Sequence, residues 1–259
     1  MKFYTYGNQR NPSIMLIPGT CCHHSMFDHV IEGLTDSFYV IVVSYSGFDE
    51  TDDSIYISQN NEVTAIEDYV TILLQGHVTC VYGSSLGGSL VADLVQRQVI
   101  RIDHAIIGSS DMDKMAPQAA KLQSIASAKL LYPIIDTGIL PSWMKKVNDI
   151  KISRHPEIRQ YRETFMKLFM PKQLRHGVVK LESIEHQIYS DLVTPIQKGI
   201  DSPYTTIHVF YATKMGPKYE KRYHKYFARP EIRFFDFYHE ELLICFPEKW
   251  LEEVKDCCR

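Results

Sequence analysis

Six residues, Gly83–Gly88, join an apolar run to a segment with helical spacing. The run Val78–Tyr82 is apolar and β-branched, as is typical of a buried strand. After the glycines, Leu86, Leu90 and Leu94 recur at an interval of one helical turn. The chain must therefore end a strand and begin a helix within a very short turn. That demand restricts the fold to architectures in which helices pack closely on a sheet.

The turn has the sequence pattern G-x-S-x-G, with Ser85 at its centre. Where a strand turns this sharply into a helix, the central residue is strained and its neighbours two positions away must be very small. Gly83 and Gly87 meet this condition, and Gly88 lets the helix approach the sheet. The turn predicts a Ser85 hydroxyl raised above the sheet edge as a nucleophile. Ser84 is adjacent but off-centre, and the alternative interpretation is a turn that only packs a helix.

Short apolar runs alternate with amphipathic segments through the rest of the chain. This alternation is typical of a mostly parallel sheet covered by helices, an α/β fold. The predicted strands are residues 1–6, Ile14–Ile17, Tyr39–Val43, Val78–Tyr82, His104–Ile107, Thr205–Ala212 and Glu231–Asp236.

The stretch 112–200 lacks strand patterns and is predicted to be helical, with interruptions at Pro133, Pro141 and Pro171. Because strand patterns return after it, we interpret it as an insertion into one domain and not as a separate domain. Residues 1–111 and 201–259 then form the core, and residues 112–200 form a helical cap.

A serine hydroxyl needs a general base to act as a nucleophile at neutral pH. Of the 11 histidines, His239 follows the last predicted strand, where ligand sites form in open α/β sheets. His208 lies inside a predicted strand instead. We therefore predict His239 as the base.

Acyl transfer also needs two N–H groups that stabilise an oxyanion. The residue after the nucleophile, Leu86, supplies one in this interpretation. The other would come from the loop after Ile14–Ile17, where Thr20 is the first candidate and Cys21 the second. A simple turn is the alternative for this loop.

With these residues identified, the chain resembles the α/β-hydrolase superfamily, in particular small bacterial esterase-like serine hydrolases. The resemblance is carried by Leu16-Ile17-Pro18-Gly19, by the Gly83–Gly88 turn and by the run His239–Leu243. It implies an eight-stranded, mostly parallel sheet flanked by helices, with a helical cap after the sixth strand. It also implies the chain order serine, acid, histidine, with no cofactor and no metal.

The sequence departs from this family where the acid is expected. The loop after the seventh strand, Tyr211–Gly216, contains no carboxylate. Some members carry their acid after the sixth strand, where this chain has Asp111 and Asp113. We choose Asp111 because it is nearer the strand end, with Asp113 second. An ordinary helix cap is the alternative role for Asp111.

The predicted function is hydrolysis of a carboxylic ester through an acyl-enzyme on Ser85. The apolar side chains of 112–200, among them Trp143 and Phe165, favour a small or medium apolar acyl substrate. An acyl thioesterase or acyltransferase would use the same residues. A different class of protein, an inactive small-molecule binding protein on the same scaffold, is favoured only by the missing acid.

Composition limits the partners. A net charge of −3 argues against nucleic acid, and no apolar stretch is long enough to span a membrane. The six cysteines show neither zinc-type spacing nor a disulfide framework, which indicates a reducing, cytoplasmic setting. A small-molecule ester or thioester is the expected partner, and the sequence leaves the oligomeric state open.

Overall fold

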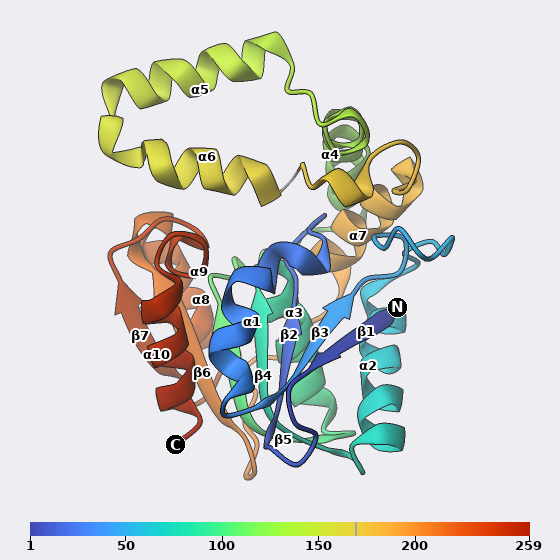
Figure 1. The fold of residues 1–259 in the computed structure, drawn as a ribbon, viewed down its shortest axis with the longest axis vertical. Helices are drawn as coiled ribbons and strands as arrows, with labels where there is room; N and C mark the ends of the chain where they lie inside the picture. Colours follow the sequence, from blue (N-terminus) through green and yellow to red (C-terminus); the bar gives the residue numbers. More distant parts are fainter. Residues whose placement is uncertain (169) are drawn as a thin grey trace.

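In the computed structural model, which describes residues 1–168 and 170–259, one twisted sheet runs through the molecule (Figure 1). Its order is β1-β3-β2-β4-β5-β6-β7. Only β1 is antiparallel to its neighbour, and the other pairs are parallel. The strands are β1 (Lys2–Tyr6), β2 (Ser13–Ile17), β3 (Tyr39–Ser44), β4 (His77–Ser84), β5 (Arg101–Gly108), β6 (Thr206–Ala212) and β7 (Glu231–Phe235). The predicted α/β fold with a mostly parallel sheet is therefore confirmed.

The prediction of eight strands was wrong, since the described residues form seven. Seven segments carry strand patterns in the sequence, and the eighth was implied by the resemblance alone. The helical insertion accordingly follows the fifth strand of this sheet, β5.

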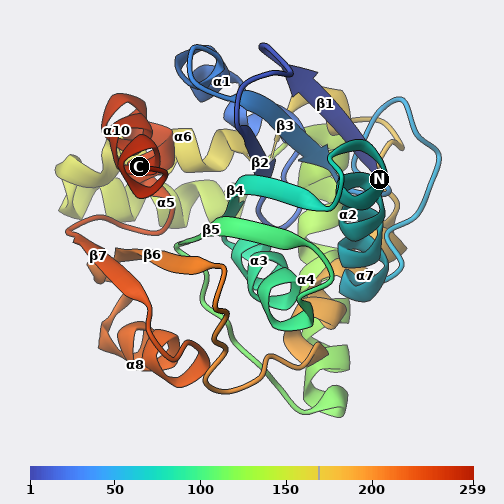
Figure 2. The ribbon, with the colours of Figure 1, turned by 90° about the horizontal axis from the view of Figure 1, so that it is seen from below.

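Helices cover both faces of the sheet (Figure 2). One face carries α1 (Asp28–Thr35) and α10 (Pro247–Cys257), and the other carries α2 (Gln59–Leu73), α3 (Leu86–Arg97) and α8 (Pro217–Tyr226). Successive strand side chains serve opposite faces. In β2, Met15 and Ile17 join the core under α2 and α3, whereas Ile14 and Leu16 join the core under α1 and α10.

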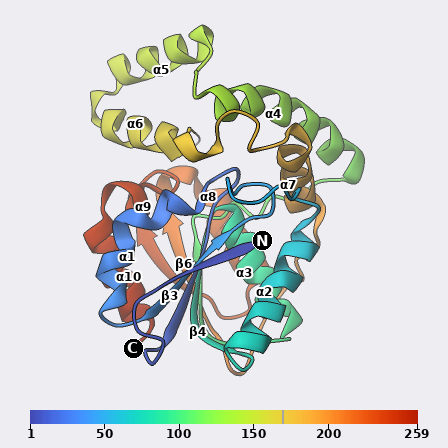
Figure 3. The same ribbon diagram turned by 45° about the vertical axis from the view of Figure 1, so that its right-hand side comes forward.

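Between β5 and β6 the chain forms α4 (Pro117–Thr137), α5 (Ser142–Arg154), α6 (Arg159–Leu168) and α7 (Leu181–Val193). These helices lie beyond the carboxyl ends of the strands (Figure 3). Pro141 and Pro171 fall between helices, but Pro133 lies inside α4, so the predicted interruption there was wrong. The chain continues as a helix through this proline, a position that supplies no N–H.

The strand order reverses at a position where ligand sites form in α/β sheets. From β2 the chain moves to β3 on one side, and β4 then lies on the other side of β2. Ligands bind α/β sheets at such a reversal, outside the carboxyl ends of the strands. The loop after β2 and the turn after β4 meet here.

Candidate active site

Ser85 occupies a strained turn between β4 and α3. Its backbone has φ +50° and ψ −111°, a conformation that non-glycine residues rarely adopt. A Cβ on Gly83 would lie 2.2 Å from the backbone of Gly87, and one on Gly87 would lie 2.3 Å from the carbonyl oxygen of Ile17. Both positions therefore require glycine, because the strand and the helix cross here at backbone contact.

His239 reaches this serine from the loop after β7. Its Nε2 lies 3.1 Å from Oγ of Ser85, a hydrogen-bond distance between residues 154 positions apart. Burial lowers the pKa of His239 below its usual 6.5, while the charge of Asp111 and a hydrogen bond to the backbone of Ser109 act in the opposite direction. The lowered pKa keeps the imidazole neutral near pH 7, as a general base must be.

The two candidate acids differ in their surroundings. Asp111 is half-buried, and its Oδ1 accepts the backbone N–H of Asp113 at 3.0 Å. Within the described residues it makes no hydrogen bond to His239 and acts on that ring through its charge. The carboxylate of Asp113 instead forms an ion pair with Arg222. Asp111 is thus the carboxylate that influences His239.

The candidate oxyanion donors come from two loops. Leu86 is the first residue of α3, so its N–H has no acceptor within the helix. The loop after β2 passes beside the serine, since a Cβ on Gly19 would lie 3.4 Å from the Ser85 Cβ. The N–H of Cys21 donates to Oε1 of Gln187 at 2.7 Å, whereas that of Thr20 has no acceptor among the described residues. Thr20 is therefore the donor left available.

Sequence reasoning missed Glu240. Its carboxyl group is buried, with 4% of the residue exposed, and Oε1 accepts the backbone N–H of Ser85 at 2.9 Å. The hydroxyl of Tyr82 donates to Oε2 at 3.4 Å. Burial raises the pKa of Glu240 to about 8, although hydrogen bonds oppose the shift. A glutamate beside a short helix resembles an ordinary capping residue, so no sequence signal distinguishes it.

Helix α6 covers the histidine side of the site. The ring of Phe165 lies 6.1 Å from that of His239, centroid to centroid, at 67°. Tyr161 stacks on Tyr238, with centroids 5.1 Å apart. Trp143, which the sequence grouped with Phe165, lies on α5 and is 56% exposed.

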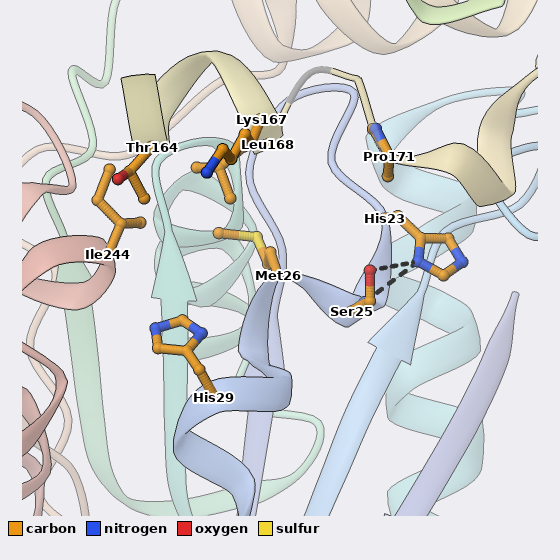
Figure 4. A pocket seen from close by; sticks show the side chains of 9 residues that line it. All are labelled: His23, Ser25, Met26, His29, Thr164, Lys167, Leu168, Pro171 and Ile244. Carbon is orange, nitrogen blue, oxygen red and sulfur yellow. Dashed lines mark hydrogen bonds between the residues drawn. The ribbon is translucent and has the colours of Figure 1, made fainter. Parts of the chain in front are cut away.

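A cavity of about 320 Å³ lies between α6 and the residues from His23 to His29 (Figure 4). Neither Ser85 nor His239 lines it. Its apolar walls are Met26, Leu168 and Ile244, and Ile244 belongs to α9 (Glu241–Cys245), which follows His239.

One group of side chains has the composition of a metal site. His23, His24 and Glu50 bring donor atoms within 4.8 Å of one another. However, Nε2 of His23 lies 2.8 Å from Glu50, and its Nδ1 accepts the backbone N–H of Ser25 at 3.3 Å. Both ring nitrogens thus have protein partners, as expected for a residue that caps the short helix His24–Phe27.

Comparisons with known proteins identify the family and the fold. The family model for the alpha/beta hydrolase fold matches residues 12–166, more than half of the chain. The chain belongs to the α/β-hydrolase fold family. No curated protein matches the sequence. No helix among the described residues is long and apolar enough to cross a membrane.

Solved structures share the fold at low identity. An alpha/beta hydrolase family protein from Desulfitobacterium hafniense has 17% identity and a TM-score of 0.75, with full coverage of both chains. A marine microorganism esterase has 15% identity and a TM-score of 0.68, covering 98% of each chain. A thermophilic esterase from Thermogutta terrifontis has 16% identity and a TM-score of 0.70, covering 98% of this chain and 91% of its own. These similarities establish the fold.

Proposed function

We propose that this protein is a serine hydrolase that cleaves carboxylic esters through an acyl-enzyme intermediate on Ser85. The main support for this proposal is the distance of 3.1 Å between Nε2 of His239 and Oγ of Ser85. It gives a serine on a strained turn the base that its reactivity needs. Two solved esterases of the same fold support the reaction class.

In the proposed reaction, His239 takes the proton of Ser85 as Oγ attacks the ester carbonyl carbon. The N–H groups of Leu86 and Thr20 stabilise the oxyanion, and the charge of Asp111 stabilises the imidazolium. His239 then returns the proton to the leaving alcohol. Water, deprotonated by His239, then attacks the acyl carbonyl carbon, and His239 gives this proton to Oγ of Ser85 as the bond to the acyl group breaks and the carboxylic acid leaves.

Residues 112–200 serve as a cap over the core 1–111 and 201–259 in this proposal. Phe165 on α6 faces His239, so it excludes water from one side of the reacting groups. The apolar cavity walls at Met26, Leu168 and Ile244 suit a small or medium apolar acyl or alcohol group.

Labelling with a fluorophosphonate tests the proposal, because such probes react with activated serines. We expect stoichiometric labelling of Ser85, located by peptide mass spectrometry, and turnover of short activated esters. Absence of both would favour an inactive binding protein. Faster turnover of matched thioesters, compared at equal acyl length, would reassign the substrate to thioesters on the same serine.

A further inference from the structure

We name the segment between α4 and α7, residues 138–180, the cap arm. It contains α5 and α6. In two views α6 lies towards the core and α5 lies on the outer side, farthest from the sheet (Figures 1 and 3). Helix α5 therefore presents one whole side to solvent.

The outer side of α5 is apolar at its centre. Trp143, Val147 and Ile150 follow at intervals of four and three residues, which places them on one helical face. They are 56%, 45% and 51% exposed. Ile139, just before the helix, is 65% exposed. By contrast, Ile152 on the opposite face is buried, so the helix is held on one side and leaves its apolar stripe uncovered.

The cap arm is also strongly basic. It holds ten Lys and Arg residues against three Asp and Glu, a net charge of +7 in a chain whose total is −3. Lys146, Lys151 and Arg154 flank the apolar stripe on α5. Among the described residues no carboxylate forms an ion pair with any of the three; the pairs nearest to them join His155 to Glu157 and Arg159 to Glu163.

We propose that the cap arm docks α5 on an anionic phospholipid bilayer. The exposed stripe with Trp143 and the neighbouring basic side chains supply the two attractions that hold a protein at an anionic membrane interface, which are burial of apolar area and electrostatic attraction. The remaining chain carries a net charge of −10. An anionic surface would therefore attract the cap arm and repel the rest of the chain. This difference would orient the molecule with α5 facing the bilayer.

A bilayer fits this surface better than a folded protein partner does. The stripe lies on the outer side of one helix and has three exposed apolar side chains, whereas a stable protein interface covers about 800 Å² per partner. Lipid headgroups rearrange around a protruding tryptophan, and the flanking cations reach their phosphates. A second copy of this chain or an acidic protein is the competing occupant that the experiment must exclude.

The protein contains its own probe for this test. Of its two tryptophans, Trp250 is fully buried and Trp143 is exposed, so a change of emission on binding reports Trp143. Full-length protein is titrated with vesicles of phosphatidylcholine alone or mixed with phosphatidylglycerol. We expect a blue shift and co-sedimentation with the mixed vesicles only, both weakened by salt. No shift with either vesicle would overturn the proposal.

Matched variants locate the contact. The triple change Lys146→Gln, Lys151→Gln, Arg154→Gln should weaken binding to mixed vesicles roughly tenfold to a hundredfold. Its control, Lys218→Gln, Lys221→Gln, Lys225→Gln, removes equal charge from exposed lysines of α8 and should bind as the unchanged protein does.

Equal loss in the two triple variants would overturn the assignment to α5, because net charge alone would then explain binding. Circular dichroism confirms that each variant is folded. Self-association of the unchanged protein that disappears in the α5 variant, without vesicle binding, would assign the stripe to a second copy instead. The catalytic serine is not involved, so Ser85→Ala should bind vesicles normally, which separates this test from that of the proposed function.

Discussion

The backbone N–H of Ser85 donates to the carboxyl group of Glu240, at 2.9 Å, and shares this donation with the carbonyl oxygen of Gly108, at 2.8 Å. The residue before Glu240 is His239, and its imidazole contacts the hydroxyl group of the same serine. Two consecutive residues after β7 thus hold both the reacting atom and the backbone of one serine. A shift of this loop would disturb the base and the strained turn together.

Replacement of Ser85 by alanine should abolish ester turnover while the protein stays folded. Loss of such a nucleophile typically lowers kcat by ~10⁶. The matched control is Ser84→Ala, which removes the neighbouring buried hydroxyl and should change kcat far less. Steady-state kinetics with an activated ester measure both variants. A larger loss at Ser84 would show that the wrong serine has been assigned.

The acid can be assigned by a second pair of variants. Asp111→Asn should lower kcat by up to ~10⁴ if its charge stabilises the His239 imidazolium. If Asp111 only caps the following turn, the same change should cost about 0.5 kcal/mol of stability and little activity. Asp113→Asn is the control, because its carboxylate pairs with Arg222. Full activity in both variants would indicate a serine–histidine dyad.

Much of this arrangement could be predicted from local sequence. The Gly83–Gly88 turn encodes a backbone crossing that only glycine permits, and the position of His239 follows from the strand order. The role of Glu240 could not be predicted, because its contact with Ser85 joins residues 155 positions apart and depends on the αL backbone of Glu240, φ +57°. Nor could the sequence place Trp143, since an apolar helical spacing looks the same whether it is buried or exposed.

Phe165 and Trp143, both in the cap, should differ in their effect on substrate preference. Phe165→Ala should lower kcat/KM about tenfold or more for larger acyl esters, because its ring packs beside His239. Trp143→Ala should leave kcat/KM for dissolved esters unchanged, since the side chain is exposed on α5. A panel of esters with increasing acyl length measures both. An unchanged profile for Phe165→Ala would count against a substrate contact at α6.

The acid limb of the pH profile should report His239. Only the neutral imidazole can accept the Ser85 proton, so kcat/KM should fall with decreasing pH at a midpoint below 6.5. Because the charge of Asp111 raises this pKa, Asp111→Asn should move the midpoint of its residual activity further down. A midpoint above 6.5, or a shift in the opposite direction, would contradict the proposed electrostatics.

Glu240 should set the alkaline limit of the enzyme. Its pKa of about 8 keeps the carboxyl group protonated at neutral pH, and above that pH a negative charge forms beside the Ser85 backbone. That charge would oppose the oxyanion of the transition state, so kcat/KM should fall as pH rises through about 8.

The free energy of unfolding should also depend on the ionisation of Glu240. A carboxyl group with a raised pKa in the folded state stabilises most below its unfolded value, 4.5, and this contribution is lost as pH rises towards 8. Glu240→Gln keeps an acceptor for the Ser85 N–H and cannot ionise. It should therefore retain activity at neutral pH, lose the alkaline fall in kcat/KM, and flatten the decline of Tm between these pH values. An alkaline limb that persists unchanged in Glu240→Gln would assign that ionisation to another group.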